Sequence, residues 1–316
     1  MTQKDKTVFE IFLQSIGLYF SNADKFLRYM FWPVFGQLIG IITIVYTVCL
    51  YNKNLDALLV TYPILNTALY KSLVLLTVLI PGLIIYLRSL WGYFITYSAV
   101  NSMAACMLKS DKLYDIPAHN LMVTGRSIQY ICLWGLYLSI ILISSIPIFW
   151  VIGGLLLIYF SFIFQIFIFE PDLAPIDCFK RSSVYVQKSF WRVFSLITLL
   201  GILTYFIIPQ IMYSFFSVIR LVEVLSKFLS QYLQIFSYSN INIIISTMGL
   251  KPITPLWTAE AIVSIIIWVM VIQMLLPLRS VCMCLWYKTQ YNDDDVVRKV
   301  DERFMKRALS SRKKKK

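Results

Sequence analysis

The sequence predicts an all-α integral membrane protein, a six-span helical bundle with amphipathic helices at the cytoplasmic interface. Of its 316 residues 59% are hydrophobic and only 14% are charged, and the mean hydropathy is +0.73. One soluble core cannot bury that much apolar surface. Apolar runs of about 20 residues recur along the chain, which is the length a helix needs to cross a bilayer. The basic residues fall mainly on one side of the resulting topology, as they do in inserted membrane proteins.

The spans are placed at apolar runs that end in polar clusters. The run from 128 to 169 is too long for one crossing, and it contains Pro147, Gly153 and Gly154, which break helices. We therefore expect a tight helical hairpin there. The predicted spans are 30–50, 69–90, 128–147, 150–169, 193–213 and 261–280.

The distribution of positive charge predicts the orientation. Of 29 Lys and Arg residues, 23 fall on one side of this topology, five fall on the other, and Arg88 lies inside a predicted span. Short loops rich in Lys and Arg stay in the cytoplasm, so both termini are predicted to be cytoplasmic. The net charge of +13 is therefore interpreted as attraction to anionic lipid headgroups, with no nucleic acid as partner.

Amphipathic segments flank the spans within a single membrane domain, 1–292. Helical spacing of apolar residues predicts interfacial helices over 7–27, 176–191 and 220–236. The last of these is expected to lie flat on the outer surface, as a lid or packed against lipid or the spans. A basic cytoplasmic tail follows at 293–316, with a helix predicted at its start.

An internal repeat organises the chain. The stretch "FLQSIGLYFSNADKFLR" before the first span resembles "CFKRSSVYVQKSFWR" before the fifth, with Ser15 matching Ser182 and Tyr19 matching Tyr185. "TA" and "LRS" recur in the second and sixth spans at one offset, and a weaker third copy begins at "NLMVTGRSIQY". The pattern favours three parallel repeats, each an interfacial helix followed by a helical hairpin. The alternative is six unrelated spans preceded by similar basic segments.

Two stretches carry a family resemblance. "EPDLAPIDCFKRSSVYVQKSFWRVFSLITLLGIL" and "MLLPLRSVCMCLWYKTQ" are similar to the multi-spanning membrane domain attached to some bacterial glycerophosphoryl diester phosphodiesterases, and to its free-standing relatives of unknown function. The resemblance implies a bacterial inner membrane location. This chain departs from the family pattern in its longer basic tail and in having no hydrolase domain. The matching residues are Glu170, Phe179, Ser182, Phe190, Trp191, Arg192, Pro277, Trp286 and Tyr287.

The sequence contains no clear catalytic or metal-binding pattern, so we expect a protein that is not an enzyme. The one histidine, His119, is expected to be an ordinary polar loop residue. Asp293 to Asp295 suit the start of a helix better than a metal site, and Cys282 and Cys284 are too few ligands for a tetrahedral shell. We therefore expect no catalytic, cofactor-binding or metal-binding residues.

The sequence favours a scaffold or lipid-interacting module in membrane homeostasis, embedded in the cell (inner) membrane. The final "RKKKK" is either a clamp on anionic lipid or, in a eukaryote, a retrieval signal of the endoplasmic reticulum membrane. The alternative function is a transporter or lipid-moving protein that uses polar groups and proline-kinked spans. The candidate interfacial anchors are Arg28, Arg88, Arg192, Arg279, Trp191, Trp286 and Tyr287; the candidate polar groups in or near spans are Glu170, Gln210 and Glu260; the candidate anionic-lipid contacts are Arg312, Lys313, Lys314, Lys315 and Lys316.

Overall fold

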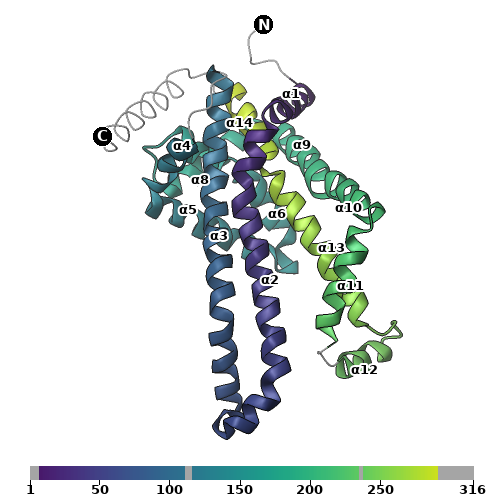
Figure 1. Cartoon of the computed structure of the whole chain (residues 1–316). Coiled ribbons are helices and arrows are strands. Elements are labelled where there is room, and N and C mark those ends of the chain that lie inside the picture. Colours follow the sequence, from purple (N-terminus) through teal and green to yellow (C-terminus); the bar gives the residue numbers. More distant parts are fainter. Residues whose placement is uncertain (1–6, 111–115, 235–237, 291–316) are drawn as a thin grey trace. The chain divides into compact units, whose positions relative to one another are not determined.

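The computed structural model describes residues 7–110, 116–234 and 238–290, and every regular element in them is a helix (Figure 1). Six of these helical segments are long and apolar enough to cross a membrane, which confirms the predicted all-helical class and identifies a multi-pass membrane protein. The predicted tail, 293–316, lies outside the described residues. The six segments are Ala23–Thr61, Ala68–Cys106, Ser127–Ser144, Pro147–Phe169, Phe190–Val218 and Pro255–Thr289.

The helices group into two compact units, which are described separately. Of the described residues, unit 1 comprises 7–30, 93–110, 116–204 and 275–290, and unit 2 comprises 31–92, 205–234 and 238–274. The elements are α1 (Val8–Ser21), α2 (Ala23–Thr61), η2 (Pro63–Asn66), α3 (Ala68–Ser110), α4 (Ile116–Thr124), α5 (Ser127–Ser144), η3 (Pro147–Phe149), α6 (Trp150–Tyr159), α7 (Ile163–Phe169), α8 (Pro175–Lys188), α9 (Phe190–Gly201), the π-helical η4 (Ile202–Ile207), α10 (Ile208–Val218), α11 (Leu221–Leu233), α12 (Ser239–Thr247), α13 (Pro255–Met274) and α14 (Leu276–Gln290).

The first two spanning helices extend well beyond the apolar runs. α2 has 39 residues and α3 has 43, whereas the sequence predicted spans of 30–50 and 69–90. The helix α2 continues through its polar end and stops just before Pro63, because the residue before a proline is driven out of the helical region.

Three of the later spans are interrupted. The fourth is divided into α6 and α7 at residues 160–162, and the fifth contains the π-helical segment before Pro209. The predicted span 261–280 is divided at Leu275, between α13 and α14. Pro277 explains this last break, because it has no N–H to donate within α13 but fits the first turn of a new helix.

In unit 2 the facing sides of α2 and α3 meet at glycines. A Cβ on Gly40 would lie 2.7 Å from the backbone nitrogen of Tyr86, and one on Gly82 would lie 2.9 Å from that of Ile44. Gly36 meets the side chain of Ser89 in the same register. Small residues at these positions let the two backbones approach closely, which is how helices pack in lipid without a hydrophobic driving force (Figure 1).

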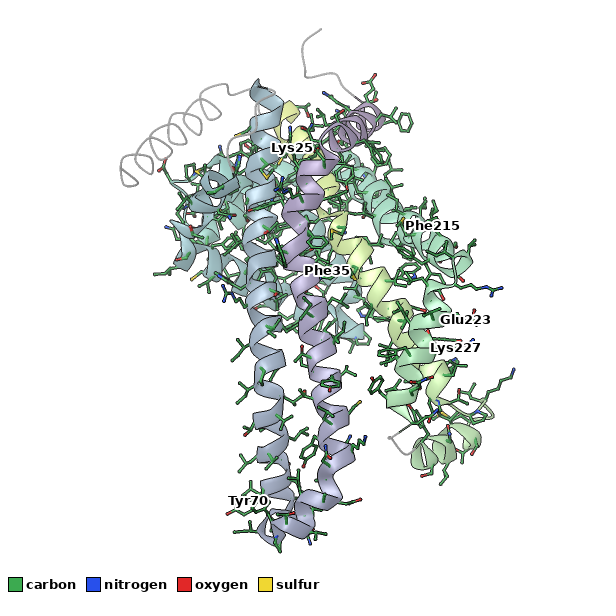
Figure 2. All side chains as sticks on the ribbon, in the orientation of Figure 1. Lys25, Phe35, Tyr70, Phe215, Glu223 and Lys227 are labelled. Carbon is green, nitrogen blue, oxygen red and sulfur yellow. The ribbon has the colours of Figure 1, made fainter. Side chains whose placement is uncertain are left out.

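The helix α11 packs along α13 in the same unit. Val222 of α11 forms a small core with Val263 and Ile267, and Leu229 packs against it. Glu223 and Lys227 form an exposed ion pair, Nζ to Oε1 2.6 Å, on another side of α11 (Figure 2). Of the apolar residues of this amphipathic helix, Val224 and Phe228 are 61% and 59% exposed, whereas Leu233 is buried.

Three short helices, α1, α8 and α11, each pack through a stripe that contains a buried serine. The buried stripe of α1 is Ile11, Ser15 and Tyr19, while its larger apolar residues Phe9 and Phe20 are exposed. A serine in the buried stripe is small enough to let a neighbouring helix approach. The larger apolar residues, on the other side of α1, can then contact lipid. The corresponding buried residues are Cys178, Phe179, Ser182 and Val186 in α8 and Val222, Ser226 and Leu233 in α11.

The core of unit 1 surrounds α7, all seven residues of which are buried. Around it pack α8, α14 and the aromatic side chains of α5. The ring centroids of Trp134 and Phe164 lie 4.6 Å apart, and those of Tyr130 and Phe167 lie 5.6 Å apart. The α5–α6 hairpin predicted from its breakers closes tightly, because a Cβ on Gly153 would lie 2.7 Å from the Cα of Ser144.

The glycine contacts predict a stability difference between two matched variants. Gly40→Ala should destabilise the protein by about 1–3 kcal/mol, because the added methyl group meets the backbone of Tyr86, which no rotamer change relieves. Gly92→Ala in α3 is the control, since a Cβ there meets nothing within 4 Å. Thermal unfolding of both purified variants in one detergent measures the difference. An equal or smaller loss for Gly40→Ala would contradict the glycine contact.

Candidate functional site

The break between α6 and α7 is bridged by a side chain from another helix. The hydroxyl of Ser182 in α8 donates to the carbonyl of Tyr159, 2.7 Å, and accepts from the backbone N–H of Phe162, 3.2 Å. These two backbone groups flank the interruption, and in hydrocarbon each would cost several kcal/mol if left without a partner. Ser182 is fully buried, so α8 supplies the hydrogen bonds that a continuous helix would make within itself.

The other end of α7 is capped by Arg126, which lies in the joint between α4 and α5. Its guanidinium donates to the carbonyl of Phe167, 2.8 Å, and to that of Leu173, 3.2 Å, and stacks over the Phe167 ring at 4.0 Å. A positively charged side chain at a helix C-terminus donates hydrogen bonds to the free carbonyls there, and its charge interacts favourably with the helix dipole. Arg126 therefore fixes both the end of α7 and the loop that follows it.

Glu170, the residue after α7, joins three helices. Its carboxylate accepts a hydrogen bond from the Tyr287 hydroxyl of α14, 2.7 Å, and lies 3.5 Å from Nε of Arg181 in α8. The Glu170 side chain is only 13% exposed, so these bonds replace water that it would otherwise bind. The charged network thus connects α7, α8 and α14 at one end of the spans.

A small hollow opens beside this network. Phe162, Tyr185, Ser189, Trp286 and Tyr287 line it, and it has room for about one water-sized group. Phe162, Trp286 and Tyr287 are buried, whereas Tyr185 and Ser189 are partly exposed at its rim. The hollow lies at the joint between α8 and α9, where Ser189 is the single residue between the two helices.

Two further polar contacts lie inside unit 1. The Oγ of Ser102 is 3.0 Å from Nδ1 of His119, and the side-chain amides of Asn101 and Gln165 approach to 3.2 Å. The expectation that His119 is an ordinary loop residue is wrong, because it lies in α4 and is fully buried.

Burial raises the pKa of the Cys178 thiol to about 11, so this thiol stays protonated at neutral pH. In the described part of the chain, no cluster of three or more His, Cys, Asp or Glu is arranged to hold a metal ion.

The predicted anchors and polar groups lie in different environments. Glu170 and Tyr287 are hydrogen-bonded to each other. Trp286 and Tyr287 are only 2% and 3% exposed, so both lie inside the protein and not on its surface. Trp191 is 76% exposed, as an interfacial anchor would be. Arg28, Arg88, Arg192, Gln210 and Glu260 are also exposed, Arg279 is half-buried, and 312–316 lie outside the described residues.

Arg88 occupies the middle of a helix and not its end. It lies 20 residues after Ala68, which starts α3, and α3 continues to Ser110. The recurring "LRS" pairs Arg88 with Arg279, but Arg279 lies in the first turns of α14 just after a helix break. The two arginines therefore differ in local structure, although both follow the same "LRS" pattern.

Three residues of the network were not predicted as site residues. Ser182 belongs to the internal repeat and to the family pattern, Arg126 lies in the weaker third copy "NLMVTGRSIQY", and Arg181 lies in the basic stretch before the fifth span. Their roles depend on a helix break at residues 160–162, where no proline or glycine marks the interruption. The serine common to the two repeated segments was the one available signal.

The bridging role of Ser182 predicts a local effect of its removal. Ser182→Ala should cost about 1–3 kcal/mol of stability, because two buried backbone groups lose their partner. Hydrogen exchange should speed up at the Phe162 amide. The adjacent Ser183→Ala is the control, since the Ser183 hydroxyl bonds only to its own helix, at Lys180, among the contacts described. Identical exchange at Phe162 in both variants would refute the bridge.

The three-helix junction at Glu170 predicts a second difference. Glu170→Gln should lower stability by about 1–3 kcal/mol, because Arg181 loses a charged partner and Tyr287 a charge-assisted acceptor. Asp177→Asn, which removes the exposed pair with Lys180, should change stability by less than about 0.5 kcal/mol. Thermal unfolding of both variants tests this. A larger loss for Asp177→Asn would show that the Glu170 contacts are not important for stability.

The comparisons with known proteins found no relative of this chain. No family model, no curated protein and no solved structure matches it. The resemblance to the phosphodiesterase-associated membrane domain therefore remains an expectation from the sequence motifs.

Proposed function

We propose that this protein is a non-enzymatic lipid-interacting module that binds anionic headgroups at the joints between short helices and spanning helices. The observation that carries the proposal is the repeated construction of these joints in unit 1. Asn22 joins α1 to α2, Gly125 and Arg126 join α4 to α5, and Ser189 joins α8 to α9. In each case a short helix turns into a membrane-spanning one within one or two residues.

Basic side chains accompany all three joints. Lys25 and Arg28 follow the first joint, Arg126 lies in the second, and Lys188 and Arg192 flank the third. Four of these are exposed, and Arg126 is the exception because it caps α7. Exposed bases at the point where a helix enters hydrocarbon are well placed to meet lipid phosphates.

The exposed apolar stripes of the short helices support an interfacial position. Phe9, Leu13 and Phe20 of α1 are 60%, 51% and 68% exposed. An apolar stripe beside basic residues is typical of a helix that lies in the headgroup region. The proposal therefore places the α1, α4 and α8 joints at the cytoplasmic face of the cell (inner) membrane, with the endoplasmic reticulum membrane as the alternative if the chain is eukaryotic.

The joints also support the proposed three parallel repeats. Each would consist of a short helix, a basic joint and a helical hairpin. The equivalent serines Ser15 and Ser182 are both fully buried on the packing side of their helices. Equivalent burial of matched residues is expected of repeats that pack alike.

A lipid-moving protein is the second candidate function. Arg88 is an exposed charge in the middle of an apolar helix, and the spans 147–169 and 255–289 are interrupted. A charge within hydrocarbon draws headgroups and water inward, which lowers the barrier for a lipid to cross.

Neutralising the joints tests the leading proposal. The triple variant Arg28→Gln, Lys188→Gln, Arg192→Gln should lose preference for anionic over zwitterionic lipid, at about 1 kcal/mol for each base near the surface. Mass spectrometry of lipids retained by the purified protein, offered phosphatidylglycerol and phosphatidylcholine together, measures this preference. The control is Lys53→Gln, Lys71→Gln, Lys251→Gln, an equal charge change on the predicted opposite side. Equal losses in the two variants would mean that the joints are not the binding sites.

The alternative has its own measurement. Vesicles with the reconstituted protein should exchange labelled lipid between leaflets faster than empty vesicles, and Arg88→Leu should abolish the gain. Exchange at the rate of empty vesicles would eliminate the lipid-moving function and leave the leading proposal unaffected.

A further inference from the structure

The hollow at the α8–α9 joint has the chemistry of a cation site. Four of its five lining residues are aromatic, and the ring centroids of Tyr185 and Tyr287 lie 5.2 Å apart at 65°. Phe162 and Tyr287 are 6.3 Å apart and inclined at 41°. Aromatic side chains that surround a small space are the surroundings in which proteins bind organic ammonium groups.

Charged groups lie beside the hollow. The Tyr185 ring interacts with a cation, since the Arg181 guanidinium lies 5.7 Å from its centroid. The Tyr287 hydroxyl donates a hydrogen bond to the Glu170 carboxylate, which shifts electron density into the Tyr287 ring. Glu170 also offsets the charge of Arg181, 3.5 Å away, so that the guanidinium does not exclude a second cation from the hollow.

We propose that the hollow binds the primary ammonium group of a phosphoethanolamine lipid headgroup. A primary ammonium is about as large as the water-sized space available, whereas a trimethylammonium is considerably larger. Ser189 lines the hollow, and the exposed bases Lys188 and Arg192 are one and three residues from it along the chain. They would pair with the phosphate, which lies two carbons from the ammonium. The assignment rests on the proposed function only for the position of the joint at headgroup level.

The decisive measurement is the preference for phosphatidylethanolamine over phosphatidylcholine of the same acyl chains. The two lipids share the phosphate and differ only in the ammonium. Native mass spectrometry of the full-length protein, titrated with each lipid and with the mono- and dimethylated headgroups, should give affinity that falls as methyl groups are added. Tyr185→Leu should weaken phosphatidylethanolamine binding by about 3- to 30-fold. Ser189→Leu, which fills the hollow, should abolish the preference.

Tyr185→Phe is the matched control, because it keeps the ring and should retain the preference. Free ethanolamine at millimolar concentration is a further arm. Its competition with the lipid would show that the ammonium is recognised directly, and competition only by phosphoethanolamine would show that the phosphate is needed as well; both outcomes support the site. Equal binding of the ethanolamine and choline lipids by the wild type would overturn it, as would an unchanged preference in both Tyr185→Leu and Ser189→Leu.

The two proposals fail separately in these experiments. Neutralising Arg28, Lys188 and Arg192 should weaken binding of both zwitterionic lipids alike and leave their ratio unchanged, while it removes the preference for phosphatidylglycerol. A wild-type protein that prefers phosphatidylglycerol but binds the ethanolamine and choline lipids equally would refute the hollow alone.

Discussion

The need to satisfy backbone hydrogen bonds in hydrocarbon governs the organisation of unit 1. The helix between 147 and 169 is interrupted at 160–162, so its N–H and carbonyl groups there need partners from elsewhere. Ser182 supplies them on one side of α7, and Arg126 supplies them at its C-terminus. Because these partners come from α8 and from the α4–α5 joint, the interrupted helix determines where both must lie.

The same requirement explains why polar residues gather at one end of α7. A helix that ends beside Glu170 presents open carbonyls and a carboxylate together, and both are served by the side chains of Arg126, Arg181 and Tyr287. The junction fixes α14 against α7 and α8, and the aromatic residues of α14 then line the hollow at Ser189. A structural solution to helix capping thus creates the chemistry for which we propose a headgroup ligand.

Small residues allow the helices to pack against one another in lipid. Lipid is as apolar as the helix side chains, so the hydrophobic effect does not drive this packing. Gly40 and Gly82 bring α2 and α3 together in unit 2, and α1, α8 and α11 each have a buried serine in the stripe that packs. In α1 the arrangement is the reverse of that in soluble proteins. Its large apolar residues Phe9 and Phe20 are exposed, and a stripe that contains Ser15 packs inside.

Composition and hydropathy were enough to predict the membrane class, the helical fold and the number of spans, because the thickness of the bilayer fixes how long an apolar run must be. Composition and hydropathy do not show how a helix is interrupted or packed inside an apolar run. It did not predict the break at 160–162, the full burial of His119 or the pairing of Glu170 with Tyr287. It also assigned Trp286 and Tyr287 to the lipid interface, although both are buried in the protein.

These features depend on which helices are neighbours. An apolar sequence carries little information about its neighbours, because nearly every side chain in it suits lipid and protein equally well. The tertiary structure decides them through a few polar groups, Ser182, Arg126 and Glu170, each of which is satisfied only when specific helices meet.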